Sequence, residues 1–280
     1  MRTEAARRRC VGLDLLKALA AAGIVLHHYQ QMAGVGFSGV NFFVAPDLFQ
    51  TEYVFGWLTI LFFMISGFLA AQQQMQQTTV RSVPAQIWHK CLRLYPMAML
   101  ACSLKSFGIA WPLLSVQAGL CEGYIPFFLG VVLAKVAPYI PRRAKYAALA
   151  LPLVCLAAIC GPFPGDWVEN QWWMQAFMIY PPLVLTAATW KDHGTAFDRA
   201  VNFLGQSSFA VYLWHCPLYS AWVLVQRLLG VQPTGTRWEM LLFLLAVELL
   251  GAVLFTLVEK PLAQYSRRWE WDKLKIVDLV

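Results

Sequence analysis

The chain has 280 residues, of which 59% are hydrophobic and only 13% are charged, against about 25% charged residues in soluble globular chains. This composition excludes a disordered chain, a collagen-like chain, a small disulfide-rich domain and an ordinary soluble enzyme. The net charge of +7 comes from 22 Lys and Arg residues against 15 Asp and Glu residues.

The apolar residues gather in blocks close to the length of a bilayer span, roughly 20 residues each. The sequence therefore predicts an all-α polytopic membrane protein. Because one bundle uses nearly all the residues, a single domain over residues 1–280 is predicted, with residues 1–10 and 262–280 as cytoplasmic tails. Eight spans are predicted, at about 11–29, 53–71, 94–110, 125–137, 146–161, 172–190, 208–229 and 238–258.

The loops between the predicted spans carry their basic residues on one side. If the N-terminus is cytoplasmic, 17 of the 22 Lys and Arg residues fall in cytoplasmic segments, two fall in external segments and three lie within spans. Membrane proteins accumulate Lys and Arg in their cytoplasmic loops. The sequence therefore predicts cytoplasmic N- and C-termini and an even number of spans, and the positive charge requires no nucleic-acid partner.

The first span carries three ionisable residues on one face. At about 100° per residue, Asp14, Lys17 and His28 share one side of a helix, and His27 points away from it. Inserting Asp or Lys at the centre of a membrane helix is unfavourable by about 2.5–3.5 kcal/mol each. Together they exceed the roughly 4 kcal/mol by which the apolar residues of this span favour insertion. This helix is therefore predicted to lie inside the bundle, with its ionisable face toward a polar cavity. The alternative is an Asp14–Lys17 pair that only fixes packing.

Other polar groups within the predicted spans suggest the same cavity. His215 lies in the seventh span, Glu248 near the middle of the eighth, and Glu259 at the inner end of the eighth. Together these groups predict a hydrated cavity within the bundle. The seven cysteines are scattered without metal-ligand spacing, so they are interpreted as small packing residues, and no metal site is predicted.

Four separated segments resemble motifs of the acyltransferase-3 family, the integral-membrane acyl-CoA O-acyltransferases that modify bacterial glycans and lipids. In chain order they are residues 13–20 (LDLLKALA) leading to His28, residues 62–69 (FFMISGFL), residues 90–96 (KCLRLYP), and residues 208–217 (SFAVYLWHCP) with residues 259–261 (EKP) beyond them. The first resembles the opening helix of the family, in which a basic residue, here Lys17, precedes the catalytic histidine. Each motif is short, but all four occur in the order of the family.

The resemblance implies transfer of an acyl group, with acetyl as the first choice, from cytosolic acyl-CoA to a hydroxyl of a sugar, an exported glycan or a glycolipid. It implies that His28 is the general base, since a neutral imidazole takes a proton near neutral pH. Three basic residues toward the inner mouth are the candidates for binding the CoA phosphates: Lys17, Lys90 and Arg93. The candidates for positioning substrate are Asp14, Ser66, Tyr212, His215 and Glu259.

Asp14 and Lys17 are expected to act apart from the general base. They lie up to about 20 Å from His28 along a helix, too far for a compact catalytic triad. We therefore expect Asp14 and Lys17 to organise the inner cavity, and another group to orient the imidazole.

Two other functions stay open from the sequence. Polar groups inside a bundle also suit a transporter or flippase for a small metabolite or a lipid-linked sugar, although no internal repeat of the transporter kind is visible. The second alternative function is that of a non-catalytic membrane scaffold. The protein is predicted to lie in the plasma (inner) membrane of a bacterium, with the lipid bilayer, acyl-CoA and a glycan or glycolipid acceptor as its partners.

Overall fold

The structure, a computed structural model, describes residues 10–33, 58–76, 115–160, 174–231 and 236–268. These segments are almost entirely helical and contain no strand apart from an isolated bridge between Cys10 and Lys191. The predicted all-α fold class is therefore confirmed for the part of the chain that the structure describes.

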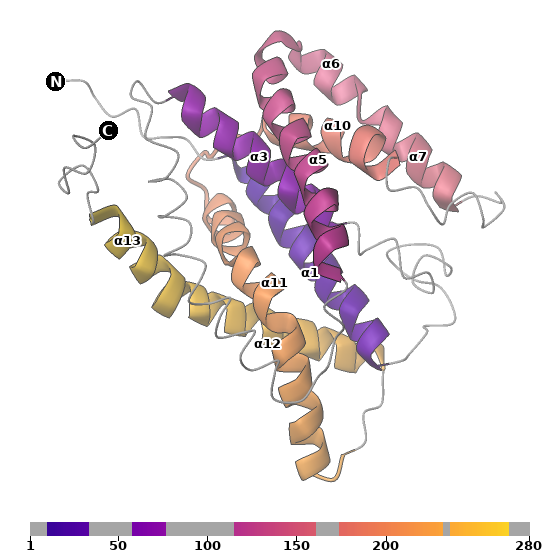
Figure 1. Cartoon of the computed structure of the whole chain (residues 1–280), viewed down its shortest axis with the longest axis vertical. Coiled ribbons are helices and arrows are strands. Elements are labelled where there is room, and N and C mark those ends of the chain that lie inside the picture. The colour runs from indigo at the N-terminus through magenta and orange to yellow at the C-terminus, as the bar shows by residue number, and fades with distance from the viewer. Residues whose placement is uncertain (1–9, 34–57, 77–114, 161–173, 232–235, 269–280) are drawn as a thin grey trace.

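The longer helices cross one another in the middle of the molecule, and the shorter ones lie toward its edge (Figure 1). The α-helices are α1 (Val11–Ala33), α3 (Leu58–Gln76), α5 (Ser115–Val136), α6 (Arg142–Ala147), α7 (Ala150–Cys160), α10 (Tyr180–Ala187), α11 (Ala196–Leu228), α12 (Arg237–Leu254) and α13 (Lys260–Arg268). A 3-10 turn, η1 (Ala137–Tyr139), follows α5, and π-helical turns precede α10 (η2, Gln175–Ile179) and α13 (η3, Phe255–Glu259).

Three of the described segments are long and apolar enough to cross a membrane: Val11–Gln30, Ala196–Leu228 and Arg237–Tyr265. They correspond to the first, seventh and eighth predicted spans. Shorter apolar helices correspond to the second, fourth and sixth predicted spans: Leu58–Gln72, Tyr124–Tyr139 and Gln175–Ala187. The third predicted span, 94–110, lies outside the described residues. The count of eight spans and the cytoplasmic termini stay predictions.

Two helices begin earlier than the spans predicted for them. The seventh span was predicted to begin at 208, but α11 begins at Ala196 because Thr195 and Asp198 form a capping box: Asp198 N–H donates to Thr195 Oγ1 over 3.0 Å. The fourth span was predicted to begin at 125, but α5 begins at Ser115 and continues through Pro126. In both helices the first turns lack the continuous run of apolar residues that predicts a bilayer span.

The first helix lies at the centre of the fold, as predicted. Along one side, α1 packs with α3, α5 and α10 around a core that includes Leu13, Met64 and Val184. Along the other side it packs with α11 and α12, where Tyr29 and Phe243 are fully buried. The ionisable residues of α1 therefore lie between packed helices, as their cost in lipid requires.

Close helix packing in this core depends on glycine. A Cβ atom on Gly67 of α3 would lie 2.0 Å from the carbonyl oxygen of Phe127 in α5, and a Cβ atom on Gly130 of α5 would lie 2.0 Å from the carbonyl oxygen of Met64. Small residues let helix backbones approach closely in membranes, where dispersion contacts replace the hydrophobic effect as the driving force. The glycine of the segment FFMISGFL thus has a packing role.

We predict that Gly67→Leu separates α3 from α5 and destabilises the protein by about 1–3 kcal/mol or more, because the backbone of α5 occupies the space of the new side chain. The measurement is the midpoint of thermal unfolding in detergent. The control is Phe63→Leu on the same helix, where the native side chain is 44% exposed. Equal midpoints for Gly67→Leu and the wild type would contradict the packing.

Candidate functional site

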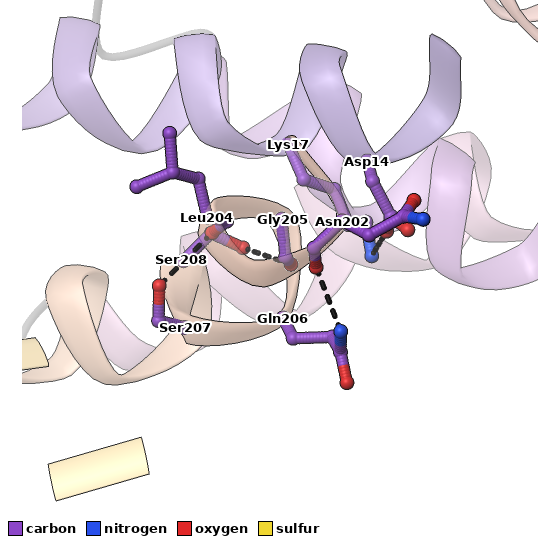
Figure 2. A network of polar contacts seen from close by, with 8 residues as sticks. All are labelled: Asp14, Lys17, Asn202, Leu204, Gly205, Gln206, Ser207 and Ser208. Carbon is purple, nitrogen blue, oxygen red and sulfur yellow. Dashed lines mark hydrogen bonds and ion pairs between the residues drawn. The ribbon is translucent and has the colours of Figure 1, made fainter. Parts of the chain in front are cut away.

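One end of the site is an ion pair on α1 held against α11. Lys17 Nζ contacts Asp14 Oδ1 one turn away, with the two side chains 19% and 10% exposed. The pair faces α11 at Gly205, where a Cβ atom would lie 2.4 Å from Cβ of Asp14 (Figure 2). Gly205 therefore allows the backbone of α11 to lie directly against the backbone and Cβ of Asp14.

The polar residues of α11 around this contact are partly satisfied by the helix itself. Ser208 Oγ donates to the carbonyl of Gly205 over 2.9 Å, and Gln206 Nε2 donates to the carbonyl of Asn202 over 2.8 Å (Figure 2). Asn202 Nδ2 donates to Asp192 Oδ2 over 2.8 Å, but the buried Asn202 Oδ1 has no hydrogen-bond partner among the described residues. Asp14, Lys17, Asn202 and Gly205 are named the inner cluster below, after the side of the membrane predicted for them.

The loop that precedes α11 ties the starts of the two helices together. Lys191 Nζ donates to Cys10 Sγ over 3.0 Å, and the Gly12 N–H donates to the carbonyl of Trp190 over 3.5 Å. The loop is ordered by its own contacts: Gly194, at φ +76°, donates its N–H to Asp192 Oδ1 over 2.7 Å. The N-termini of α1 and α11 therefore lie at the same end of the bundle.

Farther along, the same two helices bring two histidines together. The ring centroids of His28 on α1 and His215 on α11 lie 5.0 Å apart, with 38° between the ring planes. His215 is 5% exposed and His28 is half-buried. Since α1 and α11 meet first at Asp14 and Gly205 and again at His28 and His215, they run parallel. His28 and His215 therefore lie at the same depth in the bundle, a point that the sequence leaves open.

The hydrogen bonds of His215 fix its tautomer. Nδ1 lies 2.5 Å from the carbonyl oxygen of Tyr212, which can only accept, so Nδ1 carries the proton. In the neutral ring Nε2 is then an acceptor, and it lies 3.2 Å from Cys216 Sγ, whose S–H can donate to it. This bond orients the imidazole in the way that a backbone carbonyl orients many functional histidines.

Aromatic side chains from two helices surround this pair. The ring of Tyr212 lies 5.8 Å from that of His215 and 6.0 Å from that of Phe62 on α3, centroid to centroid. Phe62 begins the segment FFMISGFL, so two of the family-like segments meet the first helix at this depth. His28, His215, Tyr212, Cys216 and Phe62 are named the histidine cluster below.

The remaining predicted site residues fall in different places. Ser66 lies one turn beyond Phe62 on α3 and is exposed among the described residues. Glu259 is 1% exposed in the π-helical turn η3. Lys90 and Arg93 lie outside the described residues, so their predicted role in binding the CoA phosphates stays a prediction.

Sequence reasoning missed three residues of the site. Cys216 was interpreted as a packing residue like the other cysteines, although its place directly after His215 is visible in the sequence. Asn202 and Gly205 lie before the predicted seventh span, and only the capping signal at Thr195 and Asp198 indicates that the helix already includes them.

A bundle of apolar helices that turns ionisable groups and paired imidazoles toward one another is typical of a membrane protein with an internal polar site. The family model described as an acyltransferase domain, that of the acyltransferase-3 family, matches residues 11–109 and 104–257. Because this match includes most of the chain, the protein belongs to the acyltransferase-3 family of membrane acyltransferases. No curated protein and no solved structure shows a significant match to the chain.

We predict that Asp14→Asn lowers the free energy of unfolding by about 3 kcal/mol, since removing one member of a buried ion pair leaves the other charge without its partner. The double variant Asp14→Asn/Lys17→Met recovers most of this loss, because no charge remains there. Thermal unfolding in detergent measures both. An Asp14→Asn variant as stable as the wild type would show that the pair contributes no stability.

Proposed function

We propose that this membrane acyltransferase moves an acyl group, with acetyl as the first donor to test, from cytosolic acyl-CoA to a hydroxyl of a sugar, an exported glycan or a glycolipid. The observation that carries the proposal is the histidine cluster, in which His28 and His215 meet between the packed helices α1 and α11 with ring centroids 5.0 Å apart. Two imidazoles at one point inside a bundle suit proton transfer during acyl transfer to a hydroxyl.

On the donor side, the inner cluster supports binding of the acyl-CoA phosphates. Lys17 is only 19% exposed and already touches Asp14, so it can provide one positive charge whose position is fixed by its partner. Lys90 and Arg93 are the proposed additional cations, because polyphosphate binding uses several charge-assisted hydrogen bonds. The acyl end of the donor then extends along α1 toward His28, up to about 20 Å away.

On the acceptor side, His28 is proposed as the general base that takes the hydroxyl proton. The Nδ1–H of His215 donates to the Tyr212 carbonyl, and this bond fixes the orientation of the His215 ring. The His28 ring packs against that ring. The Tyr212 hydroxyl and Ser66 are proposed to position the substrate or to stabilise the developing oxyanion. Glu259, buried in the π-helical turn η3, is proposed to help position the substrate.

We predict that His28→Gln lowers the rate of acyl transfer by about 10²–10⁴-fold, the usual contribution of a general base. Binding of acyl-CoA is retained, because the proposed donor groups are at the other end of α1. The rate is measured with purified protein, labelled acetyl-CoA and an extract of envelope glycans. The matched control is His27→Gln, one residue away on a different face of the helix, which keeps most of the activity. Wild-type transfer by a folded His28→Gln variant would overturn the base assignment.

We further predict that deleting the protein removes one acyl unit from a cell-envelope glycan or glycolipid. Mass spectrometry of these fractions, with and without the protein, measures the mass difference, which identifies the acyl group and its acceptor together. Restoring the wild-type chain restores the acyl unit, and restoring His28→Gln does not. Identical glycan and glycolipid masses in both strains would contradict an envelope acceptor.

A further inference from the structure

The direct transfer proposed above leaves one nucleophile of the histidine cluster without a role. Cys216 Sγ lies 3.2 Å from Nε2 of His215, and Nδ1 of the same ring lies 2.5 Å from the carbonyl oxygen of Tyr212. A nucleophile, a base and a group that orients the base are the three parts of an activated-nucleophile site. The thiol is thus part of an ordered arrangement, next to the His28 ring that packs on His215.

The local backbone sets this arrangement. Pro217 lies inside α11 and has no N–H, so the carbonyl of Leu213 loses its usual helix hydrogen bond one turn earlier. Cys216 stands directly before this proline and is only half-buried, whereas Cys155 is buried. The thiol therefore lies next to an interruption in the hydrogen bonding of the helix and is not fully buried.

We propose that Cys216 accepts the acyl group from acyl-CoA as a thioester and then passes it to the acceptor hydroxyl. This inference rests on the proposed function and adds a covalent step to it. The thiolate form of cysteine is the attacking species, and an imidazole at hydrogen-bond distance produces it by taking the proton.

In the first step, Cys216 S–H gives its proton to Nε2 of His215, and the sulfur attacks the thioester carbonyl of acyl-CoA. The bond between the acyl carbon and the CoA sulfur breaks as the bond to Cys216 Sγ forms. The CoA thiolate leaves and takes the proton from His215, so the products are acyl-Cys216 and CoA with a free thiol. One thioester replaces another, and the acyl group keeps its reactivity toward hydroxyls.

In the second step, His28 takes the proton of the acceptor hydroxyl, and the oxygen attacks the acyl carbon on Cys216. The carbon–sulfur bond breaks as the ester bond forms. The Cys216 thiolate regains a proton through His215, which receives it from the protonated His28 beside it. The two histidines thus have separate tasks: His215 serves the thiol and His28 serves the hydroxyl, which accounts for a pair of imidazoles at one place.

The test uses the full-length protein in detergent, incubated with labelled acetyl-CoA without an acceptor and then quenched in acid. Peptide mass mapping is expected to find one acetyl group on Cys216, removed by neutral hydroxylamine as thioesters are. The acetyl group is absent from Cys216→Ala and present in the control Cys155→Ala. In His28→Gln it forms and then persists after acceptor is added, because only the second step needs His28.

A wild-type protein that carries no acetyl group on Cys216 after this incubation overturns the inference, as does full transfer activity in Cys216→Ala. These outcomes are distinct from a failure of the proposed function. If Cys216 stays unmodified while envelope transfer still depends on His28, the transfer is direct and the proposed function stands. If wild-type protein with labelled acetyl-CoA modifies neither Cys216 nor any acceptor, both the inference and the acetyl donor are wrong.

Discussion

The contact between α1 and α11 is the constraint on which the rest of the molecule depends. It is made at two depths, by Asp14 against Gly205 and by His28 against His215. The missing side chain at Gly205 brings the two backbones together, and the parallel course of the helices then brings the imidazoles to the same depth. A larger residue in place of Gly205 would push α11 away from α1 and separate His215 from His28. Helix packing at one end of the interface therefore sets the position of the histidines at the other end.

The contact between α1 and α11 also reduces the free-energy cost of placing the charged residues of α1 in a membrane. A carboxylate and an ammonium group are costly in hydrocarbon, and pairing Lys17 with Asp14 between α1 and α11 removes both from lipid. The pair is also poorly placed to take part in proton transfer at His28, which lies far along the helix. In the proposed function, the two clusters divide donor binding and proton transfer between the ends of one helix interface.

Much of this could be predicted from the sequence, and the reasons are local. Helical periodicity puts Asp14, Lys17 and His28 on one face, and the cost of burying them predicts a central helix. The start of α11 was missed because its first turns are polar, although the Thr195–Asp198 capping box signals it. The meeting of His28 with His215 could not be predicted, because the relative depth of two helices far apart in sequence depends on Gly205. The contact of Cys216 with His215 was not predicted, because a single thiol has no spacing pattern.

The tether between Cys10 and Lys191 has a consequence for how the protein is made. Besides its neighbours on α3 and α10, α1 packs against α11 and α12, which lie far from it in the sequence. Contacts between segments so distant in sequence form late. Before α11 packs against α1, the Asp14–Lys17 pair within α1 leaves neither of these two residues as an unpaired charge. A carboxylate one turn before Lys17 thus pairs this charge during assembly as well as in the folded protein.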